Sequence, residues 1–185
     1  ARRVRHATLM VSMRALMVVV LLSLPLSARA EFPAARLPAS GSGYTTPSTW
    51  AERGLRWGRP ELVGLIQRAA KRVTGRFKGS LLYVADLSTK RGQATQWHKT
   101  HRGGVDVDLI FYALDDKGKP MPAPSQMVVY GRDGKGVMAD GRKVQFDTRR
   151  NWALVKALLL DPRTQVTRIF VCDALRRRLL ERGKL

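Results

Sequence analysis

The pattern of apolar and polar residues predicts a series of short helices and strands. After Pro60, apolar residues recur every three to four positions, which is typical of an amphipathic helix, and the pattern stops near Gly75. A second helix is predicted over 148–160, with Asp147 in the capping position, and a third, basic helix over 175–182. Strands are predicted where short apolar runs lie between turn residues, at 79–86, 105–114, 127–130, 143–146 and 166–171.

A glycine-rich segment, 131–141 ("GRDGKGVMADG"), lies between two of these strands. It lacks the G-x-x-x-x-G-K-[ST] pattern of a phosphate-binding loop and no helix follows it directly, so a hairpin is the better interpretation. Hairpin-linked strands with helices between them predict an α+β fold over 59–185, with a mixed or antiparallel central sheet and flanking helices. The Pro-, Gly-, Ser- and Thr-rich segment 31–58 is expected to be an extended arm that Trp50 and Trp57 pin to the domain.

Residues 1–30 have the order of features found in a signal peptide. A basic start leads into the apolar stretch Ala15–Leu26, and Ala28-Arg29-Ala30 then supplies the small residues needed for cleavage before Glu31. The apolar stretch is much shorter than the roughly 20 residues that span a bilayer. The sequence therefore predicts a protein that is periplasmic or secreted and that keeps no stable membrane anchor after cleavage.

The charge balance narrows the choice of partner. The chain has 34 Lys and Arg residues against 14 Asp and Glu, a net charge of +20, and most of this excess lies outside the predicted signal peptide. Such a surface favours a polyanion. Export favours the carboxylate-bearing cell wall over nucleic acid, and the few aromatic residues form no stacking pattern for bases, so we expect no nucleic-acid partner. The one cysteine, Cys172, follows an apolar run and is expected to be buried and unreactive.

Candidate chemistry is concentrated in "QWHKTHRGGVDVDLIFYAL", residues 96–114. In one continuous strand, Asp106 and Asp108 would share a face, and carboxylates beside apolar residues are costly unless a cation compensates. The glycine pair 103–104 would let the chain turn so that a histidine folds back over an aspartate. Imidazole nitrogen and carboxylate oxygen are ligands that zinc accepts. From the residues alone, a magnesium or manganese site on the D-x-D pair and a solvated loop remain alternatives.

Two blocks of the sequence resemble the penicillin-insensitive murein endopeptidases, a family of zinc peptidases. The first is "DLSTKRGQATQWHKTHRGGVDVDLIFY", which holds the family's H-x6-D hallmark as His101 and Asp108, and the second is "FDTRRNWALVKALLLDPRTQVTRIFV". The resemblance implies zinc as cofactor, with His101 and Asp108 as its first two ligands and their metal-binding atoms about 3–4 Å apart. His98 is expected further off, where it and Asp106 would support the ligands or contact substrate. Arg91 is a candidate for a peptide carboxylate of the substrate.

The resemblance implies hydrolysis of peptide cross-links in peptidoglycan. That family completes its site with a C-terminal H-x-H strand, whereas the printed sequence has no histidine after His101. We therefore expect a domain without its last strand, with no assigned catalytic base and with little hydrolytic activity of its own. The alternative is a non-catalytic exported protein that binds the cell wall, or a decayed remnant of the enzyme.

Overall fold

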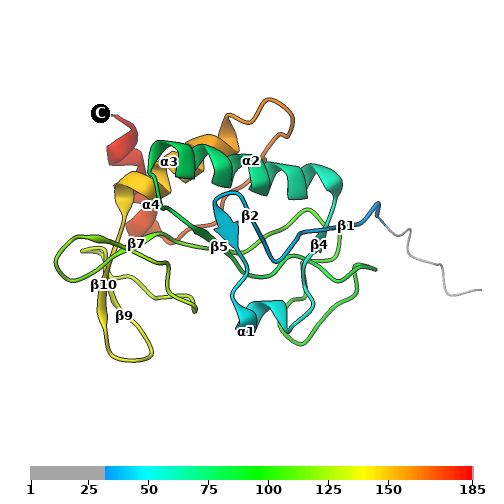
Figure 1. Ribbon diagram of the computed structural model, residues 1–185, viewed down its shortest axis with the longest axis horizontal. Helices are drawn as coiled ribbons and strands as arrows, with labels where there is room; N and C mark the ends of the chain where they lie inside the picture. Colours follow the sequence, from blue (N-terminus) through cyan, green and yellow to red (C-terminus); the bar gives the residue numbers. More distant parts are fainter. Residues whose placement is uncertain (1–31, 185) are drawn as a thin grey trace, which may run out of the picture.

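The structure is a computed structural model, and it describes residues 32–184, so the predicted signal peptide lies outside the described residues. The longer helices are α2 (Pro60–Arg76), α3 (Thr148–Leu159) and α4 (Asp173–Gly183), and a short helix, α1 (Ser48–Ala51), precedes them. Figure 1 shows α2 and α3 together above the strands, and the two helices pack on each other. No helix within residues 32–184 combines the length and apolar character that a membrane crossing requires.

The strands form three small sheets. One has the order β2-β3-β5-β6 and is built from Ser40–Gly41, Tyr44–Thr45, Leu82–Val84 and Leu109–Ile110. The second has the order β8-β7-β10-β9 and is built from Pro120–Met121, Ala113–Leu114, Lys143–Phe146 and Lys135–Val137. The third pairs β1 (Ala35–Arg36) with β4 (Trp57–Gly58). All pairings are antiparallel except β3 with β5, so the predicted α+β class with mixed and antiparallel sheets is confirmed.

Several elements begin and end where the sequence predicts. Helix α2 starts at Pro60 and buries its apolar face, including Ile66 and Val73, in the main core. Helix α3 starts after Asp147, whose side chain accepts a hydrogen bond from the backbone N–H of Arg150. The glycine-rich segment forms the predicted hairpin, in which β9 pairs with β10. Local spacing was sufficient in these cases because each element is stabilised by bonds between residues close in sequence.

Segment 32–58 is more closely integrated into the domain than an extended arm would be. Strand β3 from this segment lies beside β5 in the first sheet, and Leu37 and Tyr44 are fully buried in the main core. Trp50 and Trp57 remain partly exposed. The composition of the segment hides this role because each of its strands is only two residues long.

The prediction of a single strand over 105–114 is wrong. The chain forms β6 and β7 instead, and these belong to different sheets. Between them, the backbone N–H of Tyr112 donates to the Asn151 side-chain oxygen at 2.9 Å, and the Asn151 amide donates to the Tyr112 carbonyl at 2.8 Å. A side chain from α3 thus satisfies the backbone of Tyr112, which a strand neighbour would otherwise do.

The strands predicted at 127–130 and 166–171 do not form either. Tyr130 makes only an isolated bridge to Gly136. In 166–171 no residue pairs with a strand within the described part of the chain, and Phe170 is 85% exposed. Cys172 follows this run and is exposed, so the expectation of a buried thiol is also wrong. An apolar run becomes a strand only where a neighbour accepts its backbone hydrogen bonds, and sequence alone does not show that neighbour.

Candidate metal centre

The candidate site lies just after the end of β5. There, backbone hydrogen bonds like those between β5 and β6 continue for two more residues. The backbone N–H of Ala85 donates to the Asp108 carbonyl, and the N–H of Asp108 donates to the Asp86 carbonyl, each at 2.9 Å. These two bonds hold the Asp108 backbone beside that of Asp86. Gly104 adopts a φ of 66°, which favours glycine, and it reverses the chain between the histidines and Asp108 as the sequence predicts.

His101 is oriented by two bonds to the segment that follows β5. Its Nδ1 lies 2.7 Å from the Leu87 carbonyl oxygen, and its own carbonyl accepts from the Ser88 hydroxyl at 2.6 Å. Because a carbonyl oxygen can only accept, the neutral ring carries its hydrogen on Nδ1 and leaves a lone pair on Nε2. That Nε2 lies 3.7 Å from an Asp108 carboxylate oxygen, so the predicted convergence of these two side chains is observed.

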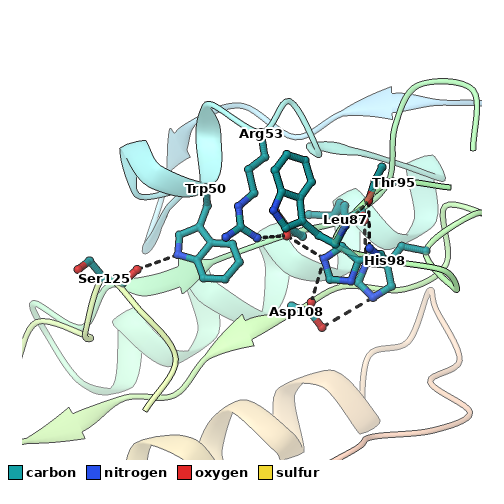
Figure 2. A network of polar contacts seen from close by, with 10 residues as sticks. Trp50, Arg53, Leu87, Thr95, His98, Asp108 and Ser125 are labelled. Carbon is teal, nitrogen blue, oxygen red and sulfur yellow. Dashed lines mark hydrogen bonds and ion pairs between the residues drawn. The ribbon is translucent and has the colours of Figure 1, made fainter. Parts of the chain in front are cut away.

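His98 lies as close to Asp108 as His101 does, so the expectation that it would sit further off is wrong. Its Nε2 is 3.7 Å from the second carboxylate oxygen of Asp108. The two imidazole rings stack with their centroids 4.2 Å apart and their planes within 5°. The hydroxyl of Thr95 accepts from the His98 backbone N–H at 3.0 Å (Figure 2), and this bond holds the turn that precedes the stacked ring.

His98, His101 and Asp108 form a group that could hold a metal ion. Each offers one ligand atom, and the three atoms lie within 4.8 Å of one another. Two imidazole nitrogens and one carboxylate oxygen are ligands that suit zinc and other divalent transition metals. The set fits such an ion in one further respect, because the hydrogen bond from His101 to Leu87 is of the kind that orients metal-bound histidines.

The remaining predicted residues lie outside this group. Asp106 is partly buried and near enough for its charge to act on Asp108. Arg91 is exposed on the loop between β5 and β6. Neither residue contributes a ligand atom to the three-residue group.

The site brings three carboxylates together, of which Asp86 is fully buried and Asp106 and Asp108 are partly buried. Burial raises the pKa of Asp108, the two histidines act to lower it, and the charges of Asp86 and Asp106 raise it further. A bound cation would favour the ionised carboxylate and so counter this shift.

Asp86 is the site residue that sequence reasoning missed. Its side chain is fully buried, and one oxygen, Oδ2, lies 2.8 Å from Arg53 Nη1 and 2.8 Å from His98 Nε2. The other oxygen, Oδ1, has no hydrogen-bond partner among the described residues. A signal was available, because Asp86 ends the apolar run "LLYVAD", and a carboxylate that directly follows a buried strand needs a partner.

The fold and the cluster define an α+β protein with a candidate transition-metal site. A model of the penicillin-insensitive murein endopeptidase family matches residues 31–184. A relative of that name from Klebsiella pneumoniae (strain 342) is 29% identical over 146 residues, and one from Escherichia coli O157:H7 is 30% identical over the same length. Both alignments cover 77% of this chain and 50% of the relative. The chain therefore belongs to the penicillin-insensitive murein endopeptidase family, as its motifs predict, and it spans about half the length of the curated relatives it matches.

Proposed function

We propose that the protein is a zinc-dependent endopeptidase that hydrolyses peptide cross-links of peptidoglycan. The observation that carries this proposal is the convergence of His98, His101 and Asp108 in a chain of this family. The relatives carry the name murein endopeptidase, and murein is the substrate we infer for this chain. The sequence features of a signal peptide and the excess of basic residues support a periplasmic or secreted protein that acts on the cell wall.

Each residue of the cluster has a role in this proposal. His101 would bind the metal through Nε2, since its Nδ1 is held by the Leu87 carbonyl. Asp108 would bind through a carboxylate oxygen. His98 would be the third protein ligand, the number that catalytic zinc sites generally have. When bound, zinc polarises a carbonyl and lowers the pKa of its water to about 7.

Two further residues are proposed to face the substrate. The Asp106 carboxylate would accept hydrogen bonds from the amide groups of a stem peptide. The Arg91 guanidinium would bind a stem-peptide carboxylate, for which its planar set of donors is suited. Neither role requires either residue to touch the metal.

A non-catalytic protein that binds the cell wall is the second candidate. The observation that favours it is that both described histidines already belong to the cluster and are hydrogen-bonded within the protein. Among the described residues there is then no further imidazole to transfer the proton of a peptide hydrolysis. The sequence-based prediction of little hydrolytic activity therefore stays a prediction, and one assay distinguishes the two candidates.

The test is to incubate the 185-residue chain with zinc and purified peptidoglycan, and to measure soluble muropeptides by chromatography. The proposed enzyme requires release that a chelator stops, that Asp108→Ala abolishes, and that the matched Asp140→Ala leaves unchanged, because Asp140 is an exposed aspartate outside the cluster. Removal of one of three ligands should cost at least about 10²-fold in activity. Co-sedimentation with peptidoglycan without release would support the wall-binding candidate and contradict the enzyme.

A further inference from the structure

The bonding of His98 points to a positioning element behind the cluster. A fully buried carboxylate is costly unless charged or polar partners compensate it. Asp86 has two such partners, Arg53 and His98, and both use the same oxygen at 2.8 Å. The guanidinium can only donate, so the shared Asp86 oxygen is an acceptor toward Arg53, and a carboxylate oxygen in that position also accepts from a ring N–H. The hydrogen in the bond between Asp86 and His98 therefore belongs to Nε2 of the imidazole.

Arg53 is itself held in place by aromatic rings. Its guanidinium carbon lies 4.1 Å from the centre of the Trp50 ring and 5.0 Å from that of Trp97. The indole N–H of Trp50 donates to the Ser125 carbonyl at 2.7 Å, which anchors that ring (Figure 2). The Arg53 side chain is 27% exposed, so the rings take the place of part of its hydration.

We propose that Arg53 and Asp86, clamped by Trp50 and Trp97, act as positioning residues that fix the ring and the hydrogen of His98. The two histidines of the cluster then carry their hydrogens on opposite nitrogens, Nε2 in His98 and Nδ1 in His101. With its hydrogen held on Nε2, His98 offers Nδ1 as its lone-pair nitrogen. The metal-related part of this inference rests on the proposed function, whereas the hydrogen position belongs to the metal-free protein.

The first measurement is nuclear magnetic resonance of the ¹⁵N-histidine-labelled, metal-free 185-residue chain at a pH where the imidazoles are neutral. Substitution of each histidine in turn assigns the ring signals. We expect an exchange-protected Nε2–H for His98 and an exchange-protected Nδ1–H for His101. In Arg53→Gln the protection at His98 should fall at least tenfold while that at His101 stays, and Arg53→Lys should restore part of it.

The second measurement is metal affinity, from competition titration with zinc and from the visible absorption of bound cobalt. Loss of an outer-shell partner typically lowers metal affinity about 10–100-fold, and we expect this for Arg53→Gln. The matched control is Arg142→Gln, which removes an arginine from an exposed ion pair with Asp140 and should change nothing. The cobalt spectrum should also change in Arg53→Gln, because the coordination of His98 changes.

Wild-type protection at His98 together with wild-type affinity in Arg53→Gln would overturn the proposal. If Arg53→Gln does not fold, Trp97→Leu tests the proposal in its place. Trp97 is 45% exposed, and its substitution removes only one of the two rings that hold Arg53. It should reduce protection at His98 in the same direction, and no change would reject the clamp. A wild-type chain that shows both protected hydrogens but binds no metal would defeat the proposed function and leave the positioning role standing.

Discussion

At the residue scale, three consecutive residues after β5 contact every member of the candidate cluster. The Asp86 carboxylate bonds the ring of His98, and its carbonyl accepts from the backbone of Asp108. The Leu87 carbonyl bonds the ring of His101, and the Ser88 hydroxyl donates to the His101 carbonyl. One short segment therefore holds both imidazole rings and the backbone of Asp108 through hydrogen bonds.

Ser88→Ala tests this orientation with the smallest possible change. Ser88 is buried, and its loss leaves the His101 carbonyl without the hydroxyl donor. A lost neutral hydrogen bond costs roughly 0.5–1.5 kcal/mol, so zinc affinity should fall by up to about tenfold. Competition titration with a zinc indicator measures the change, with the exposed Ser42→Ala as control. Equal affinity in the two variants would show that Ser88 does not orient His101.

At the scale of elements, α3 joins the two four-stranded sheets. Its first turn carries the buried ion pair of Asp147 with Arg150, and Arg150 also donates to the Ala113 carbonyl. Asn151, in the same turn, satisfies both backbone groups of Tyr112. These bonds fall at the point where the chain passes from β6, next to the candidate site, to β7 in the second sheet. The side chains of α3 thus decide where the first sheet ends.

Asn151→Ala should destabilise the protein strongly. The substitution leaves the backbone N–H of buried Tyr112 without the Asn151 acceptor, whereas the Tyr112 carbonyl keeps the backbone N–H of Asp147 at 3.1 Å. An unsatisfied buried group costs roughly 1–3 kcal/mol. We expect the free energy of unfolding to fall by about 1–3 kcal/mol in urea titrations followed by circular dichroism. Lys156→Ala, an exposed position on the same helix, is the control and should behave like the wild type. A variant as stable as this control would mean that water replaces the asparagine.

At the scale of the whole molecule, two ion pairs tie distant parts of the chain together. Arg53 reaches Asp86 at the candidate site, and Arg68 on α2 forms a two-bond pair with Asp161, after α3, at 2.8 and 2.7 Å. The second pair therefore connects α2 to the segment that follows α3, and α2 and α3 are the helices that lie above the strands in Figure 1. The hydrogen bonds from Arg68 lower the pKa of Asp161 to about 2, although burial opposes the shift, and the backbone N–H of Arg163 lowers it further.

The pair predicts a pH dependence of stability. Because the pKa of Asp161 is lower in the folded chain, its stabilisation is complete above the unfolded pKa near 4 and is lost as the pH falls through about 2. Asp161→Asn should therefore lower the free energy of unfolding at pH 7, by about 1 kcal/mol after allowance for solvent screening. The difference from wild type should vanish between about pH 4 and pH 2. Urea titrations at several pH values measure this, with Asp140→Asn as an exposed-pair control; a gap that persists at pH 2 would exclude an electrostatic origin.

The sequence by itself determined the features that depend on neighbouring residues. The spacing of apolar residues was sufficient for α2 and α3, and the glycine-rich segment was sufficient for the hairpin of β9 and β10. The family and the convergence of His101 with Asp108 also followed from the sequence, because six intervening residues with a glycine turn limit how far the two side chains can separate.

The tertiary structure alone decided which distant groups complete the site. Asp86 lies 12 positions before His98 and 33 after Arg53, so no local period connects the three residues. The end of β6 was likewise decided by Asn151, which lies 39 positions from Tyr112. The spacing of apolar residues in the sequence predicts which face of a helix or strand is buried. The partner of a buried polar group instead depends on which loop or helix packs against it. That packing placed His98 beside Asp108 and left the apolar run before Cys172 exposed.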